Sequence, residues 1–157
     1  SPIAFNHRFC LSHPEITTLS VGAGKPEELD AHLEALKDDD FSSKADLDIR
    51  QRLDDRISLL GKDYCNYCSD CLPCPEQVNI PEVLRLRNMD VGYDMRGFGQ
   101  YRYNMLKVDD NWFPGAFGDK CNDCGDCLPR CPEKLDIPRL VKDTHKRLYK
   151  PKESTDS

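Results

Sequence analysis

Two cysteine runs constrain the fold of this chain more than any other feature of its 157 residues. The first run, CNYCSDCLPCP, contains Cys65, Cys68, Cys71 and Cys74, and the second, CNDCGDCLPRCP, contains Cys121, Cys124, Cys127 and Cys131. The second run follows the pattern C-x2-C-x2-C-x3-C-P, in which thiolates bind iron–sulfur clusters. The first run is the same pattern with one residue missing before its last cysteine. Together the two runs predict two [4Fe–4S] clusters.

The two runs belong to an internal repeat. CNYCSDCLPCPEQVNIP aligns with CNDCGDCLPRCPEKLDIP when Arg130 is treated as an insertion. Three cysteines at successive two-residue spacings surround one side of a cube, and the cysteine before proline usually reaches the other cluster. We therefore predict crossed ligation, with one cluster on Cys65, Cys68, Cys71 and Cys131, and the other on Cys74, Cys121, Cys124 and Cys127. The shortened first run leaves open whether Cys74 completes its site.

Zinc and disulfide bonds are the alternative uses of these cysteines. Four-cysteine zinc sites pair two C-x2-C units that lie far apart in sequence, whereas here such spacings follow one another directly. A disulfide framework does not need this spacing either, and no signal peptide is visible, so we expect reduced thiols in the cytoplasm. A structural metal or zinc domain that mediates interactions remains the second hypothesis. Cys10 lies outside both runs and is expected to be a small buried hydrophobic residue.

Composition limits the other classes of function. Hydrophobic residues make up 38% of the chain and charged residues 32%, so bound clusters would have to contribute to folding. The formal net charge of −6 argues against a nucleic-acid binder, which normally carries a basic patch. An acidic electron carrier favours a redox partner with a basic docking surface. No apolar stretch reaches the length of a membrane span, so a soluble protein is expected.

Helices are predicted around both runs. Asn79 and Asp136 each precede an Ile-Pro step and are expected to cap the helices that follow the two runs. A helix from Ser42 or Ser43 to Gly61 is predicted by apolar residues at helical spacing, which would pack against the cluster region. Another helix is expected over residues 101–106. The aromatic loop 109–118, which contains Trp112, Phe113 and Phe117, is expected to shield a cluster and fill a small core.

Residues 1–37 have a different pattern, which predicts helix, strand, glycine turn and helix. Residues 4–11 are expected to be helical, and His13 before Pro14 ends this helix. Residues 16–21 are rich in β-branched residues and predict a strand, and Pro26 opens a second helix. Asp38, Asp39 and Asp40 predict a solvated linker. We therefore divide the chain into a first segment, 1–37, and a cluster domain, 38–157.

The first segment resembles the end of an aldo/keto reductase barrel through Leu11-Ser12-His13-Pro14, Gly22-Ala23 and Pro26-Glu27. The resemblance implies the last strand and helix of a TIM-type barrel, with a loop for the phosphates of NADP at Gly22, Ala23 and Lys25. Glu28 and His32 depart from the family, and a carboxylate at position 28 would repel the adenosine 2′-phosphate. The family's catalytic Asp, Tyr, Lys and His are absent, so no catalytic residue is assigned.

The cysteine runs and the Ile-Pro steps after them resemble the helical ferredoxin extension at the carboxyl end of one branch of aldo/keto reductase-like oxidoreductases. The two resemblances imply a mainly α fold, a duplicated α-helical ferredoxin-like module preceded by a small α-β-α remnant of a barrel end. The implied function is electron transfer as the terminal module of such an oxidoreductase, between an upstream reductase barrel and a redox partner. A ferredoxin-like subunit of a larger redox complex is the remaining alternative.

Overall fold

The computed structural model describes residues 1–37, 43–110 and 112–151, and it divides into two compact units. Unit 1 is Ser1–Asp54 and unit 2 is Asp55–Ser157. No strand is present in the described ranges, so the chain is mainly α-helical there. The predicted Asp38–Asp40 linker and Ser42 lie outside these ranges. The division of the chain at residues 37 and 38 stays a prediction.

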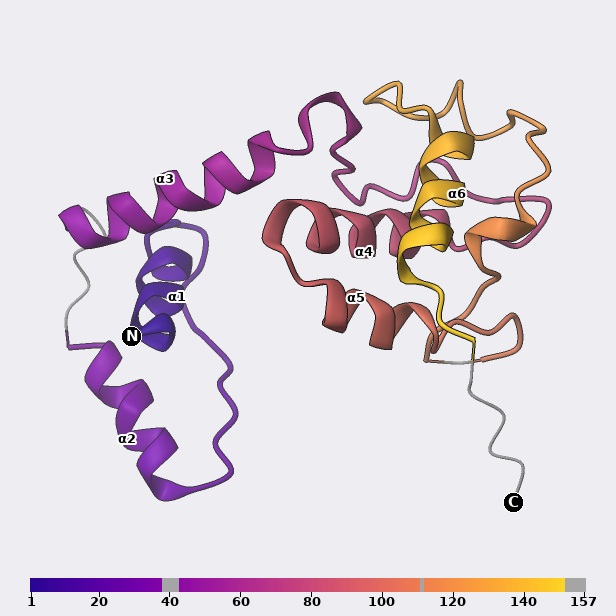
Figure 1. Ribbon diagram of the computed structural model, residues 1–157. Helices are drawn as coiled ribbons and strands as arrows, with labels where there is room; N and C mark the ends of the chain where they lie inside the picture. Colours follow the sequence, from indigo (N-terminus) through magenta and orange to yellow (C-terminus); the bar gives the residue numbers. More distant parts are fainter. Residues whose placement is uncertain (38–42, 111, 152–157) are drawn as a thin grey trace, which may run out of the picture. The chain divides into compact units, whose positions relative to one another are not determined.

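Unit 1 contains α1 (Pro2–Leu11), α2 (Pro26–Ala35) and most of α3 (Lys44–Ser58) (Figure 1). Ser1 caps α1, because its hydroxyl accepts a hydrogen bond from the Ala4 amide at 3.2 Å. Ser43 does the same for α3, with its hydroxyl 3.2 Å from the Asp46 amide. Both helices predicted in residues 1–37 are present, as α1 and α2.

A buried ion pair joins α1 to α3 within unit 1. The Arg8 guanidinium donates to both carboxylate oxygens of Asp46, each at 2.7 Å. The Asp46 side chain is only 1% exposed. Hydrogen bonds from Arg8 and Ser43 lower the pKa of the Asp46 carboxyl group, although burial opposes this. The folded unit 1 therefore stabilises the Asp46 side chain in its ionised form.

The strand predicted over residues 16–21 is wrong. This segment has no regular secondary structure, and Ile16 and Val21 are 39% and 43% exposed. A strand is stabilised by hydrogen bonds and side-chain contacts with a neighbouring strand. The described residues provide no second strand, so β-branched residues alone do not create one here.

Unit 2 contains the end of α3, the short 3-10 helices η1 (Gly61–Asp63) and η2 (Gly118–Lys120), and the helices α4 (Ile80–Tyr93), α5 (Arg96–Tyr103) and α6 (Ile137–Leu148). Figure 1 shows α4 and α5 side by side, and α6 packs against both. No helix among the described residues is long and apolar enough to cross a membrane.

The core of unit 2 lies between these three helices. Its fully buried members include Val83, Leu84 and Leu86 of α4, Tyr103 of α5, and Ile137, Leu140, Val141 and Leu148 of α6. An ion-pair network fixes η1 to the helices, because Asp63 pairs with both Arg87 of α4 and Arg139 of α6.

Both predicted caps after the cysteine runs are confirmed. The Asn79 carboxamide oxygen accepts from the Glu82 amide at 3.2 Å, and the Asp136 carboxylate accepts from the Arg139 amide at 3.3 Å. The helix expected over residues 101–106 begins earlier, at Arg96, and ends at Tyr103.

The aromatic loop and the stripe of α3 only partly behave as predicted. Phe117 stacks on Tyr103 with ring centroids 5.1 Å apart, but Trp112 is 85% exposed and fills no core. In the α3 stripe and its continuation, Leu60 is buried beside Gly92 of α4, whereas Leu53 is 39% exposed. The apolar period of this helix therefore does not mark one continuous buried face.

Candidate metal centre

Two neighbouring cavities in unit 2 are lined by thiol groups. The first cavity is lined by Cys65, Cys68, Cys71 and Cys131. The second cavity is lined by Cys74, Cys121, Cys124 and Cys127. Each cavity therefore receives three cysteines from one run and the last cysteine of the other run.

The first three cysteines of each run lie in the same local backbone conformation. Tyr67 and Asp123 have φ values of 62° and 61°, and the residues two positions further, Ser69 and Gly125, have φ values of 71° and 82°. A left-handed conformation costs a non-glycine residue about 1–2 kcal/mol, so it persists only where surrounding contacts require it. In both runs this turn places successive cysteines around one cavity.

Arg130, the extra residue of the second run, spans the gap left by the shorter first run. Its Nε donates to the Asp126 carbonyl at 2.9 Å, and its Nη2 donates to the Pro73 carbonyl at 2.8 Å. The second contact lies beside Cys74, which lines the second cavity together with Arg130. The inserted side chain therefore links the shortened end of one run to the middle of the other.

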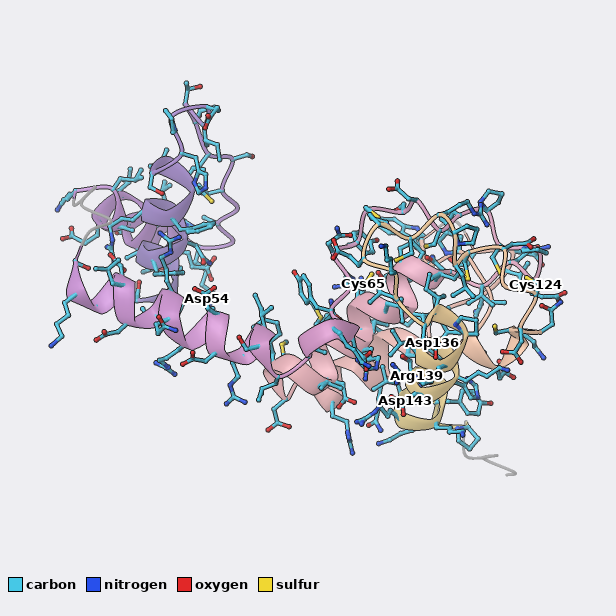
Figure 2. All side chains as sticks on the ribbon, turned by 90° about the horizontal axis from the view of Figure 1, so that it is seen from above. Asp54, Cys65, Cys124, Asp136, Arg139 and Asp143 are labelled. Atoms are coloured by element: carbon cyan, nitrogen blue, oxygen red, sulfur yellow. The ribbon has the colours of Figure 1, made fainter. Side chains whose placement is uncertain are left out.

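The starts of α4 and α6 form the cavity walls. Pro81 and Leu84 of α4 line the first cavity, and Pro138 and Val141 of α6 line the second. Ile137 lines both cavities and separates them. Figure 2 shows Cys65 and Cys124 on either side of the start of α6, where Asp136 is labelled.

Buried polar residues on the helices hold the backbone around the cysteines. Asn88 of α4 donates to the Cys65 carbonyl at 2.7 Å and accepts from the Cys65 amide at 3.5 Å. Tyr103 accepts from the Gly118 amide at 2.8 Å, and its hydroxyl lies 3.0 Å from His145 Nδ1. Sequence reasoning missed these anchors, and no local pattern in the sequence pointed to them.

Burial raises the pKa of the inner thiols. It raises the pKa of Cys71 to about 12, and it also raises the pKa of Cys65 and Cys127, with neighbouring cysteines adding to the effect. Thiolates in these positions therefore need a cationic group to stabilise them. Iron supplies such charge, and soft thiolate donors in an apolar wall suit an iron–sulfur cluster. The donor sets of both cavities fit this group.

Disulfide bonds and single metal ions are the other uses of the cysteines that the sequence left open. All nine cysteines are free of disulfide bonds. In the described ranges, no group of three or more His, Cys, Asp or Glu side chains is placed to hold a single metal ion. Cys10 is half-buried, so its predicted burial is only partial.

The suggested NADP loop lies in unit 1, and its residues Gly22, Ala23 and Lys25 are exposed. The Glu28 carboxylate accepts a hydrogen bond from the Gly24 amide at 2.7 Å. The His32 ring lies 3.2 Å from the Gly22 carbonyl. A backbone amide that could bind a phosphate is thus already paired with an acidic side chain, and nothing in this loop supports NADP binding.

Comparison with known proteins agrees with the chemistry of the cavities. Residues 64–135 match the family model of the 4Fe-4S dicluster domain, and this range contains both cysteine runs. The match supports an iron–sulfur, ferredoxin-like module in this part of the chain. No curated protein and no solved structure matched the chain. The matched range does not include residues 1–37, where the resemblance to the end of an aldo/keto reductase barrel lies.

Proposed function

We propose that unit 2 binds two [4Fe–4S] clusters and transfers single electrons through them. The observation that carries this proposal is the pair of neighbouring cavities, each lined by four cysteines drawn from both runs. Bound clusters would supply the redox chemistry, and the protein would position them and limit the access of water.

Crossed ligation is part of the proposal. Cys131 lines the first cavity together with three cysteines of the first run, and Cys74 lines the second cavity together with three of the second. Cys131 contributes to the raised pKa of Cys65, and Cys74 contributes to the raised pKa of Cys127, so each last cysteine lies close to the run opposite its own. Cys127 also acts on Cys71, because the two sites are neighbours. These contacts support the ligand sets Cys65, Cys68, Cys71 and Cys131, and Cys74, Cys121, Cys124 and Cys127.

The burial of the cysteines suggests a path for the electron. Cys71 and Cys127 are buried at the inner side of their cavities, and Ile137 lies between the two sites. Cys68 and Cys124 are exposed at the outer sides. An electron would therefore enter at one exposed edge, cross the wall that contains Ile137, and leave at the other edge.

The wider context is a further part of the proposal. The order of the two sequence resemblances supports a terminal module of an aldo/keto reductase-like oxidoreductase that works in the reducing cytoplasm. The net charge of −6 supports a redox partner with a basic docking surface. We assign no catalytic residue and no NADP site to this chain.

Anaerobic preparation and metal analysis test the clusters directly. Two four-iron cubes require about eight irons and about eight sulfides per chain, with electron paramagnetic resonance signals that appear on reduction. Reversible reduction of both clusters supports electron transfer. Colourless protein that contains zinc, or clusters that are reduced only when the protein unfolds, would refute it.

Cysteine variants test the crossing. Cys131→Ser and Cys68→Ser should perturb the same cluster signal, and Cys74→Ser should perturb the other. Cys10→Ser is the matched control, because Cys10 lies in unit 1 outside both cavities. If Cys74→Ser instead perturbs the same cluster signal as Cys68→Ser, each run holds its own cluster.

A further inference from the structure

Two asparagine–glutamate pairs join the cysteine runs at their edges. The Asn66 carboxamide donates to Glu133 at 3.1 Å, and the Asn122 carboxamide donates to Glu76 at 2.8 Å. Each asparagine follows the first cysteine of its run, and each glutamate follows the Cys-Pro step that ends the other run. The repeat has therefore placed the same contact twice, both times between different runs.

Each asparagine also shapes its own cysteine loop. The Asn66 carboxamide oxygen accepts from the Cys68 amide at 3.2 Å, and the Asn122 oxygen accepts from the Cys124 amide at 3.1 Å. A backbone amide on one side and a carboxylate on the other fix the orientation of the carboxamide, because oxygen must face the donor and nitrogen the acceptor. Asparagine satisfies both partners, and aspartate would satisfy only the amide.

The two pairs follow the division of the cysteines between the cavities. Asn66 and Glu133 both line the first cavity, which contains Cys131. Asn122 and Glu76 both line the second cavity, which contains Cys74. In each case the glutamate lies two residues after the last cysteine of its run, so the pair limits how far that cysteine can move from the other three.

We propose that Asn66–Glu133 and Asn122–Glu76 are positioning clasps that hold the fourth cysteine of each site against the three from the other run. The inference rests on the crossed ligation proposed above. The clasps act through the cysteine backbone and leave all four thiols free to bind iron. Each clasp serves one cavity only, so its loss should affect one cluster and leave the other unchanged.

Iron release to a ferrous chelator under anaerobic conditions tests the first clasp. Asn66→Ala should release half of the bound iron about threefold to tenfold faster than the wild type, because one exposed hydrogen bond and the turn beside a ligand are lost. Asn66→Asp keeps the turn but places two carboxylates together, so it should release iron at least as fast as Asn66→Ala. Asp70→Ala, an exposed change in the same run, is the matched control.

Variants of the glutamate separate the hydrogen bond from the charge. Glu133→Gln keeps an oxygen that can accept from Asn66 and should retain iron nearly as well as the wild type. Glu133→Ala should behave like Asn66→Ala. If Glu133→Gln and Glu133→Ala release iron at the same rate, the hydrogen bond to Asn66 does not hold the site and the proposal is refuted.

Double variants test which residues work together. Asn66→Ala and Glu133→Ala should be non-additive, because both remove the same clasp. In the combination of Asn66→Ala with Glu76→Ala, each cluster should release its iron at the rate of its own single variant, because the two residues belong to different clasps. A redox titration of Asn66→Ala should shift one of the two midpoint potentials, with the far-UV circular dichroism unchanged. Equal shifts in both potentials, or additive effects for Asn66 and Glu133, would overturn the proposal. Protein with about eight irons but no effect of Asn66→Ala would refute the clasp alone, whereas fewer irons in the wild type would refute the proposed function.

Discussion

Gly118 is the position where a single methyl group should disturb the second cavity most. It begins η2, three residues before Cys121, and it lies directly against the backbone of α6. A Cβ atom at Gly118 would lie 2.1 Å from the Val141 carbonyl oxygen and 2.7 Å from the carbonyl carbon. Its partner is helix backbone, which cannot rotate away as a side chain can. We therefore predict that Gly118→Ala separates η2 from α6.

The size of the effect follows from these distances. A carbon and a carbonyl oxygen approach to about 3.3 Å in favourable contacts, so η2 must move by about 1 Å. Overpacking of this kind costs about 1–3 kcal/mol, and the same movement weakens the hydrogen bond from the Gly118 amide to Tyr103, for about 1 kcal/mol more. The free energy of unfolding should fall by about 2–4 kcal/mol. For a unit of this size, the unfolding midpoint should then drop by about 10–20 °C.

Thermal unfolding under anaerobic conditions, followed by visible absorbance and far-UV circular dichroism, measures this drop. Gly97→Ala is the matched control, because its Cβ would meet no atom within 4 Å and it lies within α5. Alanine is the better helix former, so the control should gain about 0.5–1 kcal/mol. If Gly118→Ala unfolds at the same temperature as Gly97→Ala, η2 is not held against α6 as described.

Three further changes test separate parts of the structure. Tyr103→Phe removes the acceptor of the η2 amide and should lower the free energy of unfolding by about 1–2 kcal/mol in urea titrations. Asp46 has a pKa below its ordinary value of 3.8, so its ion pair with Arg8 stabilises unit 1 above about pH 4 and is lost as the pH falls through the folded-state pKa. Asp46→Asn should therefore flatten the acid titration of the far-UV circular dichroism in this range, and an unchanged slope would contradict the assignment. Arg130→Ala removes the contact with the Pro73 carbonyl and should speed iron release from the second cavity about threefold, whereas Lys120→Ala, an exposed change nearby, should not.

The features that the sequence predicted correctly depend on local interactions. Asn79 and Asp136 cap helices because each side chain reaches an amide three residues ahead in the same segment. Iron–sulfur chemistry was also predictable, because cysteines separated by two residues can all reach one four-iron cube from a single short loop. The match to a 4Fe-4S dicluster domain agrees with it.

The features that the sequence did not predict depend on residues far apart in the chain. Residues 16–21 have the composition of a strand, but a strand needs a partner that the described residues do not contain. Asn88 and Tyr103 contact backbone 23 and 15 residues away, so no local pattern marks them. The left-handed φ of Tyr67 belongs to a residue type that rarely adopts it, and only the tertiary contacts of the loop explain it.

The hydrophobic core and the cavity walls of unit 2 use the same side chains. Val78, Ile80, Leu135 and Ile137 belong to the buried core, and each also lines a thiol-containing cavity. These side chains pack against helices on one side and would pack against a cluster on the other. Because burial raises the pKa of the inner thiols, bound iron would be needed to stabilise them as thiolates, and the cluster would also complete the packing around them. Cluster binding and folding of unit 2 should therefore be one coupled event, and this explains how a chain with 32% charged residues can maintain a buried centre.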